Sequence, residues 1–442
     1  MNSIKTNTSY FALMLAVLGV AGVAEAAPFT QCPGDDYMLH PDQLTNPGQY
    51  VAGNDSVPDP FIVDLGTGLP TATPNPSFRP EVKCMHLGAG DGFVRMSDDQ
   101  RYLQYMFSFM NLTGTDSSKA METGFLAAQF PAPAIVLDEG QQFYLSLTNV
   151  GMANRPDLSD PHTVHFHGFP QASDTFDGVP DATISINMGS TLTYFYNIVE
   201  PGTYMYHCHV EATEHMQMGM LGNLYVHAGQ DKTAPGTLLG AHTHTATDRY
   251  VYNDGDGTTR YDVEVPIQLS SFDSNFHDAS MTTQPLPFAN MKDNYVMLNG
   301  RGYPDTVNPA VDAIPAPAEN GGQLSQQENA LVEATAGQTI LLRLSNLNVT
   351  NHYTLRILGL DMTVVGRGAR LQRGPDGKDL YYTTNHVQVG PGEGIDVLID
   401  TNGVTPGTYY LYSTNLNFLT NNQEEFGGAM TEIRIAAAPP AI

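Results

Sequence analysis

The sequence predicts an all-β protein made of two similar Greek-key β-sandwich domains behind an irregular N-terminal extension. Glycine (42 residues) and proline (30) are frequent among the 442 residues, and the runs between them are short and rich in Val, Thr, Tyr and Phe. This texture favours many strands joined by turns. Several runs also alternate apolar with polar residues, which is the period of a strand with one buried face. Finally, segments of the first half of the chain recur in the second half.

The first 26 residues have the pattern of a secretory signal peptide. Lys5 precedes an apolar stretch from Tyr10 to Val23, and Ala24-Glu25-Ala26 is a cleavage pattern. A retained anchor is the alternative, but the apolar run is short for a membrane span. No later segment is apolar enough to cross a bilayer. We therefore expect a periplasmic or secreted protein with no membrane span once the signal peptide is removed.

Residues 27–100 are rich in Pro, Asp and Gly and show only weak periodicity, so we expect an irregular extension there. Export permits disulfides. We expect Cys32 and Cys84 to form a bridge that pins this extension to the rest of the protein. The third cysteine, Cys208, lies among histidines and is taken up below.

The first domain is expected over residues 101–230 and the second over 249–438, with a polar linker at about 228–248 between them. In the first domain the segments 105–109, 134–137, 142–147, 191–196, 202–206 and 224–227 have the composition of strands. The second domain repeats two of these segments closely. Residues 336–346 repeat the pattern of 138–149, and residues 406–413 repeat that of 201–208. We therefore predict a duplicated fold.

The formal net charge of −27, with only 19 Lys and Arg residues, argues against nucleic-acid binding. Contacts with phosphates require clustered basic side chains. An acidic surface suits cationic partners such as metal ions or basic redox proteins, although it also serves solubility.

The most informative residues lie between positions 162 and 220. They are His162, His165, His167, the run His207-Cys208-His209, His215 and Met220. Two histidines, one cysteine thiolate and a weak axial methionine are the ligands of a blue-copper electron-transfer site. Zinc also accepts histidine and cysteine, but the softer set with a single thiolate favours copper. Met218 is the alternative axial ligand.

The remaining histidines indicate more than one copper. Alternate side chains of a strand share a face. His207 and His209 should therefore point to one side of their strand and Cys208 to the other, and His165 should share a face with His167. The backbone at Cys208 would then join a copper held through sulfur to a second metal group.

These motifs resemble those of the multicopper oxidases, a cupredoxin-fold family. The resemblance rests on His162-x-x-His165-x-His167-Gly168, on His207-Cys-His-x5-His215-x4-Met220, on Asp177-Gly-Val-Pro180 and on Pro201-Gly-Thr-Tyr-x-Tyr-His207, and it covers roughly residues 101–435. It implies two cupredoxin-like domains. It further implies a type 1 copper held by His162, Cys208, His215 and Met220, and part of a type 2/type 3 trinuclear centre held by His165, His167, His207 and His209. Asp177, Glu211 and Glu214 would be the nearby acids that supply protons.

The second domain departs from the family pattern. A complete trinuclear centre in this family uses eight histidines from two domains. Here the expected counterpart of residues 162–167 is 351–356, and that of residues 207–209 is 412–414. Neither segment can bind copper, and His352 is out of register. We therefore expect a structural second domain without copper ligands.

Three arrangements could resolve the missing half. First domains of neighbouring subunits could meet and pool their histidines, which predicts a homo-oligomer. His242 and His244 in the linker could reach the group. Alternatively, the protein could resemble the copper nitrite reductases and hold a single additional copper. The catalytic Asp of those enzymes would, however, fall at the position of His165.

The resemblance implies an exported enzyme that oxidises a donor by one electron at type 1 copper. Electrons would then pass along the Cys208 segment to a copper cluster that reduces oxygen to water. The donor could be a small molecule, a metal ion or a redox protein. The alternative is a blue-copper electron carrier or copper-handling protein with an incomplete cluster. Copper content and oxygen consumption distinguish the two.

Overall fold

The protein is described by a computed structural model that covers residue 32 and residues 61–64, 69–74, 79, 81–97, 101–115, 117–282, 285–422 and 424–438. The signal peptide predicted at residues 1–26 lies outside these residues, as does most of the predicted N-terminal extension.

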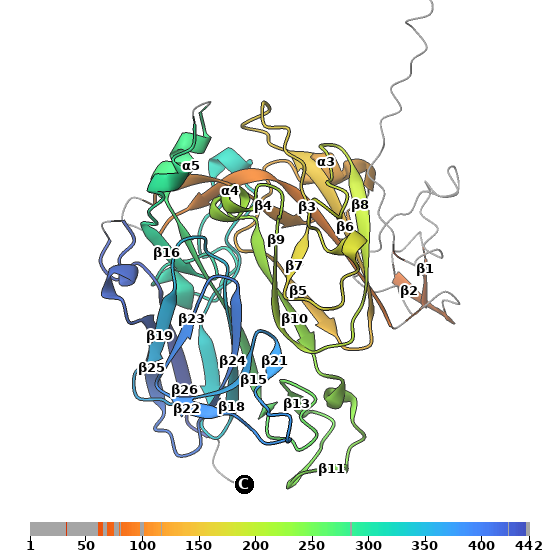
Figure 1. The fold of residues 1–442 in the computed structure, drawn as a ribbon, viewed down its shortest axis with the longest axis vertical. Coiled ribbons are helices and arrows are strands. Elements are labelled where there is room, and N and C mark those ends of the chain that lie inside the picture. Colours follow the sequence, from red (N-terminus) through yellow and green to blue (C-terminus); the bar gives the residue numbers. More distant parts are fainter. Residues whose placement is uncertain are drawn as a thin grey trace, which may run out of the picture.

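Two β-sandwiches make up the body of the molecule (Figure 1), which confirms the predicted fold class. In the first sandwich one sheet has the strand order β4-β3-β6-β8 and the facing sheet has the order β5-β10-β9-β7. The strands are β3 (Val82–Arg95), β4 (Leu103–Asn111), β5 (Ala132–Asp138), β6 (Gln142–Gly151), β7 (His165–His167), β8 (Thr191–Asn197), β9 (Gly202–His207) and β10 (Leu221–His227).

The second sandwich has the orders β16-β15-β18-β24-β20-β21, with β22 also paired to β20, and β17-β26-β25-β19-β23. Its strands are β15 (Val263–Phe272), β16 (Tyr295–Leu298), β17 (Val332–Thr335), β18 (Thr339–Asn346), β19 (Tyr353–Ile357), β20 (Met362–Arg367), β21 (Arg370–Leu371), β22 (Tyr382–Thr384), β23 (His386–Val389), β24 (Glu393–Asp400), β25 (Gly407–Ser413) and β26 (Met430–Ala436).

The two sandwiches share one pairing scheme. In the first, β3 runs parallel to β6 and β5 parallel to β10. In the second, β15 runs parallel to β18 and β17 parallel to β26. The antiparallel partners correspond as well, since β9 lies between β10 and β7 just as β25 lies between β26 and β19. The predicted duplication is therefore present, and strands β20 to β23 are an addition to the second copy.

The first sandwich begins earlier than the predicted boundary at residue 101. Strand β3 lies in the middle of its sheet, between β4 and β6, although the sequence placed it in the irregular extension. Three glycines and the buried Asp91 interrupt its apolar pattern, which explains the error. Asp91 is satisfied there, because it accepts hydrogen bonds from the Tyr105 hydroxyl and from the backbone of Ala153 and Asn154.

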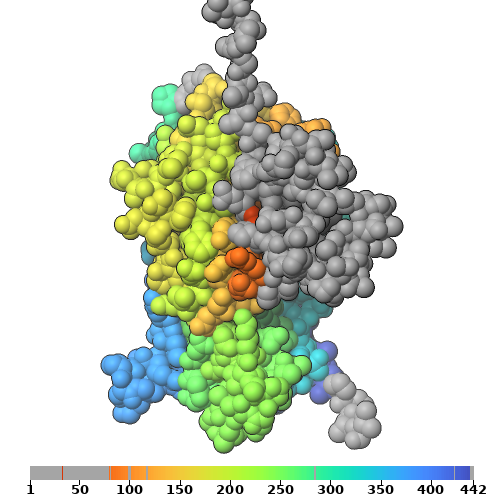
Figure 2. Space-filling model, turned by 90° about the vertical axis from the view of Figure 1, so that its right-hand side faces the viewer, coloured from red at the N-terminus to blue at the C-terminus, as the bar shows by residue number. Residues whose placement is uncertain are grey.

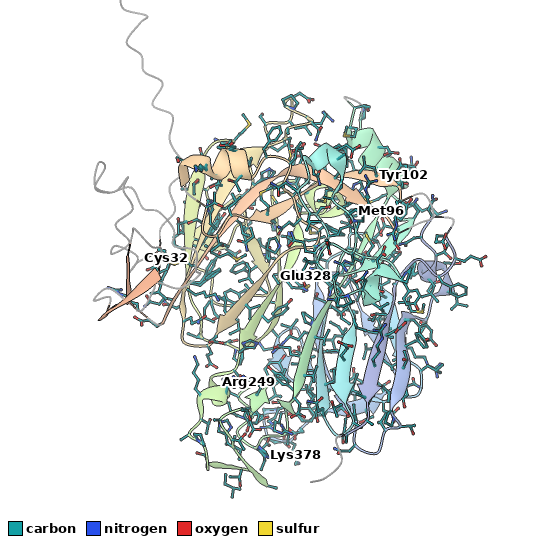
Figure 3. All side chains as sticks on the ribbon, turned by 180° about the vertical axis from the view of Figure 1, so that it is seen from behind. Cys32, Met96, Tyr102, Arg249, Glu328 and Lys378 are labelled. Atoms are coloured by element: carbon teal, nitrogen blue, oxygen red, sulfur yellow. A yellow bond between two sulfur atoms is a disulfide. The ribbon has the colours of Figure 1, made fainter. Side chains whose placement is uncertain are left out.

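The predicted disulfide between Cys32 and Cys84 is confirmed, with a Cα–Cα distance of 5.8 Å. Cys84 lies on β3, so the bridge fixes Cys32 to the first sandwich. Figure 3 shows Cys32 at the side of this sandwich that faces away from the second one. The short strands β1 (Phe61–Asp64) and β2 (Leu69–Pro74) pair with each other nearby.

The linker and the first residues of the predicted second domain form a small lobe, seen in green at the bottom of Figure 2. It contains β11 (Leu238–Leu239), β12 (His242–Thr243), β13 (Arg249–Tyr250) and β14 (Arg260–Tyr261). The described α-helices are short and comprise α3 (Ala120–Thr123), α4 (Ala212–Met218) and α5 (Ser274–Ser280). Among the described residues, no helix combines the length and apolar character needed to cross a membrane.

Each sandwich encloses its own apolar core, and a third core lies between them. The shared core joins Met96, Met106 and Leu221 of the first domain to Phe272 and Met297 of the second. Burial of apolar surface at about 25 cal/mol per Å² is the main force that holds such layers together. The second domain is thus packed firmly against the first.

A buried ionic network also crosses the domain interface. Arg343 on β18, whose side chain is 0% exposed, pairs with Glu264 and lies 3.5 Å from the carboxylate of Asp396. Its Nη1 donates a hydrogen bond of 3.0 Å to the hydroxyl of Thr203 on β9. His227 at the end of β10 contacts Glu264 at 3.0 Å. The network therefore links β9, the strand that leads to Cys208, with the second domain.

We expect the His227 part of this network to make stability depend on pH. Its hydrogen bond with Asp138, followed by that with Glu264, raises the pKa of His227 from 6.5 to about 9. The stabilisation is fully present below pH 6.5 and is lost as the pH rises to about 9. The difference in unfolding free energy between wild type and His227→Gln, at most about 3 kcal/mol, should shrink over this window in urea titrations. A difference that stays constant from pH 6 to pH 9.5 would contradict this assignment.

Candidate metal centre

Three buried side chains converge beside the end of β9. His162 precedes β7 and forms an isolated bridge with Ile186, Cys208 directly follows β9, and His215 lies in α4. Their donor atoms all lie within 4.8 Å of one another. The Cys208 Sγ is 3.2 Å from the Nδ1 of His215 and 3.7 Å from the Nδ1 of His162. All three residues are 0% exposed. Two imidazoles and one thiol in a closed site fit copper.

The electrostatics of the site favour the thiolate that a metal requires. Burial would raise the pKa of the Cys208 thiol, but the charge of His215 and hydrogen bonds with His162 and His215 outweigh it and hold the pKa well below its usual value. Burial lowers the pKa of His215, whereas Cys208 and Asp160 raise it, to about 10. The thiolate is the ligand form of cysteine, so the surroundings of Cys208 favour metal binding, whereas His215 must lose its proton to bind a metal.

Met220 lies directly beside these ligands. The backbone N–H of Cys208 donates to the carbonyl of Met220 at 3.2 Å, and the N–H of Met220 donates to the carbonyl of His215 at 2.8 Å. Met218 and Met220 are both fully buried in the core that contains Cys208. Gly219 ends α4 with a φ of +115° and lets the chain turn from the helix into β10. The choice of Met220 over Met218 as axial ligand stays a prediction.

The other four histidines gather on the opposite side of the same segment. We call His165, His167, His207 and His209 the four-histidine group. His165 on β7 stands opposite His207 on β9, with ring centroids 5.2 Å apart. The His209 ring lies 4.9 Å from that of His165 and 5.7 Å from that of His207. The segment 207–209, which begins at the last residue of β9, thus places the sulfur beside His162 and His215 and its flanking imidazoles beside His165.

Backbone carbonyls orient two rings of the four-histidine group. The Nδ1 of His165 lies 2.6 Å from the carbonyl of Asp177, and the Nδ1 of His207 lies 2.8 Å from the carbonyl of Cys208. A ring nitrogen held in this way leaves the Nε2 as the free donor. Burial is the main cause that lowers the pKa of His207 to about 3, and it also lowers the pKa of His167. These rings are therefore neutral, as metal ligands must be.

Within the described residues, no three donor atoms of the four-histidine group lie within 4.8 Å of one another. Its rings are close, but their nitrogens do not form a compact site in one chain. His207 is buried, whereas the other three members are partly exposed. The group is therefore open on one side and does not form a compact set of metal donors within one chain.

The structure separates the three predicted acids. The Asp177 carboxylate lies 3.6 Å from His165, at the four-histidine group. Glu211 instead belongs to a second set of three donors, with Asp160 and His215. Burial raises the pKa of Glu214, whose charged neighbours also include His215, Glu211 and Asp160. Glu211 and Glu214 thus lie close to His215.

Asp160 is a residue that the sequence reasoning missed. Its Oδ2 lies 3.9 Å from the Nε2 of His215, longer than a hydrogen bond. That nitrogen has no hydrogen-bond partner and is fully buried. The position of Asp160 two residues before His162 was the signal available. Asp160 and Glu211 together place negative charge beside His215, a candidate copper ligand.

The strand register corrects the predicted correspondence between the domains. His165 pairs with His207, and in the second domain Arg356 pairs with Tyr412, the counterpart of His207. Arg356 therefore corresponds to His165, two residues away from the expected match to His167, and Tyr353 corresponds to His162. Ser413 takes the place of Cys208. None of these positions holds histidine or cysteine, so the conclusion that the second domain lacks the copper ligands is unaffected.

A cleft of about 610 Å³ lies in the part of the second domain that corresponds to the loops with the candidate copper ligands in the first domain. It is lined mainly by amide and hydroxyl side chains, including Asn351, Asn415, Asn417 and Thr420. His352 does not line it and lies instead against Gly390.

The linker histidines are used locally. The Nε2 of His242 lies 2.7 Å from Asp248, and the Nδ1 of His244 lies 3.0 Å from the Tyr250 hydroxyl. Both histidines belong to the lower lobe, whereas β7 and β9 lie in the body of the first sandwich (Figure 1). Within one chain, the structure therefore does not bring His242 or His244 to the four-histidine group.

Comparisons with known proteins agree with this geometry. A family model described as multicopper oxidase matches residues 112–231, and a second model of the same description matches residues 268–434. The two matches together cover more than half of the chain.

Two curated relatives are laccases. One from Aspergillus fumigatus is 30% identical over 129 residues, which are 29% of this chain and 20% of the relative. A putative laccase from Oryza sativa subsp. japonica is 23% identical over 326 residues, which are 72% of this chain and 46% of the relative. The chain thus spans less than half the length of either relative.

Solved structures share the fold. A blue copper oxidase from Nitrosomonas europaea aligns with a TM-score of 0.56 and 22% identity over 80% of this chain and 86% of that one. A copper nitrite reductase from the same organism aligns with a TM-score of 0.52 and 15% identity over 80% and 94%. At these identities the alignments establish the fold alone.

Proposed function

Because the chain belongs to the multicopper oxidase family, we propose that it is an exported copper-dependent oxidase that takes single electrons from a donor and reduces oxygen to water. One observation carries this proposal. The segment 207–209 turns a buried cysteine toward His162 and His215 and turns its two flanking histidines toward His165. One short stretch of backbone thus serves two groups of metal ligands. The pattern of residues 1–26 supports export to the periplasm or the exterior.

Copper held by His162, Cys208, His215 and Met220 would supply one-electron redox chemistry. The side chains exclude water from that site, because all four are fully buried. His162 and His215 stabilise the thiolate of Cys208. Since Cys208 adjoins both His207 and His209, the covalent path between the two ligand groups is only a few bonds long.

Electrons are proposed to enter at the outer edge of His215. Asp160 and Glu211 lie there, and Glu214 is close by. Their negative charge, together with the net charge of −27, favours a cationic donor such as a metal ion or a basic redox protein. Asp177, beside His165, is the acid suited to supply protons to oxygen at the four-histidine group.

Oxygen chemistry requires further ligands for the four-histidine group. We propose that a second copy of the chain supplies them in a homo-oligomer, since the group is partly exposed and the second domain lacks equivalents. The second candidate function is a blue-copper electron carrier or copper-handling protein. It is favoured by the observation that, within the described residues of one chain, the four histidines do not form a compact set of metal donors.

Reoxidation by air tests the proposal. In the absence of air, ascorbate should bleach the blue band of the copper-loaded wild type and of His165→Ala alike, because the site at Cys208 is intact in both. Air should then restore the colour rapidly in the wild type and at least about 100-fold more slowly in His165→Ala, the usual scale for loss of a catalytic group. His386→Ala, which removes an exposed histidine far along the chain, should behave as the wild type. If air fails to restore the wild-type colour, the protein is a carrier.

A further inference from the structure

The turn between β23 and β24 of the second domain lies against the four-histidine group. Gly392 occupies this turn with a φ of +78°. A Cβ at Gly392 would lie 2.3 Å from the Cε1 of His167, and the three nearest atoms to it all belong to that ring. A hydrogen bond with the backbone of Gly392 also opposes the lowering of the His167 pKa by burial. The second domain thus contacts His167 through the backbone of Gly392.

The turn is held firmly in place. The N–H of Gly392 donates to the carbonyl of Asn346 at the end of β18, at 2.8 Å. The N–H of Gly390 donates to the Glu393 carboxylate at 2.8 Å, and the N–H of Glu393 donates to the carbonyl of Gly390 at 3.0 Å. The Asn346 amide also donates to the carbonyl of Val389 at 3.0 Å. Hydrogen bonds at Gly390, Gly392 and Glu393 therefore define the conformation of the turn.

The strand that follows the turn is tied to the first domain. The hydroxyl of Thr203 on β9 donates to Asp396 on β24, and Asp396 is only 1% exposed. The ideal Cβ position of Gly394 lies 3.1 Å from the carbonyl oxygen of Thr203, so β24 passes close to β9. Since β9 ends at His207, the position of the Gly392 turn relative to the four-histidine group is fixed by the domain interface.

We propose that Gly392 is a positioning residue for His167. Through this residue the second domain fixes the orientation of the His167 imidazole ring. His165 and His207 are oriented by carbonyls of the first domain. His167 receives the equivalent support from the second domain. Groups that orient a metal-binding imidazole typically change metal affinity by about 10- to 100-fold when they are altered. This inference rests on the proposed role of the four-histidine group as copper ligands.

The chain offers a closely matched control for the test. Gly377 has a φ of +79°, almost the same as Gly392, but nothing lies within 4 Å of its ideal Cβ position. Alanine at either position has the same unfavourable backbone conformation. Only Gly392→Ala also collides with the His167 ring. The difference between the two variants therefore isolates the collision from the backbone strain.

The first readout is the imidazole of His167 in the metal-free full chain, labelled with ¹⁵N in its histidine rings. The signal is assigned by its loss in His167→Ala. In Gly392→Ala the ring nitrogen shifts of His167 should move, whereas in Gly377→Ala they should stay at their wild-type values. An unchanged His167 signal in Gly392→Ala would overturn the proposal.

The second readout is Cu²⁺ uptake beyond the ion that accounts for the blue band. Gly392→Ala should need about 10- to 100-fold more free Cu²⁺ for this additional uptake, with the blue band unchanged, and Gly377→Ala should titrate as the wild type. Equal uptake by wild type and Gly392→Ala would overturn the positioning role in metal binding. If the wild type takes up no additional Cu²⁺ while the His167 signal still moves, the four-histidine group does not bind copper. The proposal that Gly392 orients the His167 ring would still stand.

Discussion

Replacement of Cys208 by serine is expected to abolish both the blue absorption band of the copper-loaded protein and the proposed oxidase activity. The band arises from the bond between copper and a thiolate, and Cys208 is the free cysteine among the described residues. The serine hydroxyl stays protonated and cannot replace the bond between copper and the thiolate sulfur. The activity should fall to the background rate of the donor with oxygen, because electrons then have no entry site. The visible spectrum and oxygen uptake measure both effects.

The second domain supplies a control for this variant. Ser413 stands at the position that corresponds to Cys208 and is also fully buried. Ser413→Ala should keep the blue band and the activity at wild-type levels. A blue band that survives in Cys208→Ser would show that the type 1 assignment is wrong.

Arg343→Ala is expected to cause the largest loss of stability. Arg343 is completely buried and pairs with Glu264 and Asp396, the latter only 1% exposed. Removal of the guanidinium leaves the buried Asp396 without a cation, whereas Glu264 keeps His227 as its charged partner. Breaking a buried ion pair from one side costs about 3–5 kcal/mol. The free energy of unfolding from urea titrations at neutral pH should fall by this amount.

Arg434→Ala is the matched control for Arg343→Ala. The Arg434 side chain is 43% exposed and pairs with Glu432, so its loss should change the unfolding free energy by about 0–1 kcal/mol. If both variants lie within about 1 kcal/mol of the wild type, the interface network does not stabilise the protein. The tie between β9 and the second domain would then rest on apolar packing.

The repeated strands and the grouping of His162, Cys208 and His215 could be predicted from the sequence because their signals are local. Alternation within β4, β6 and β8 is visible over a few residues, and the His-Cys-His segment carries its own geometry. The strand β3 escaped prediction because its pattern is broken by glycines and by Asp91. The partners of Asp91 lie up to 63 residues away, so no local pattern could reveal that it is satisfied.

The position of Glu211 and Glu214 beside His215 has a local cause that composition does not reveal. Glu211 precedes α4 with a φ of +46°, a left-handed conformation that non-glycine residues adopt infrequently. This conformation turns the chain after His209 into α4, which carries His215. Glu211 and Glu214 therefore lie close to His215. The contact between Gly392 and His167 joins residues of different domains. Such contacts depend on how the domains pack, which no single segment encodes.

The copper content of the assembled, copper-loaded protein tests the central claim most directly when oxygen uptake is measured on the same sample. The account predicts an oligomer with more than one copper per chain, of which one gives the blue band, and oxygen uptake when a donor is added. An assembled protein that holds one copper per chain, blue and inert toward oxygen, would contradict it.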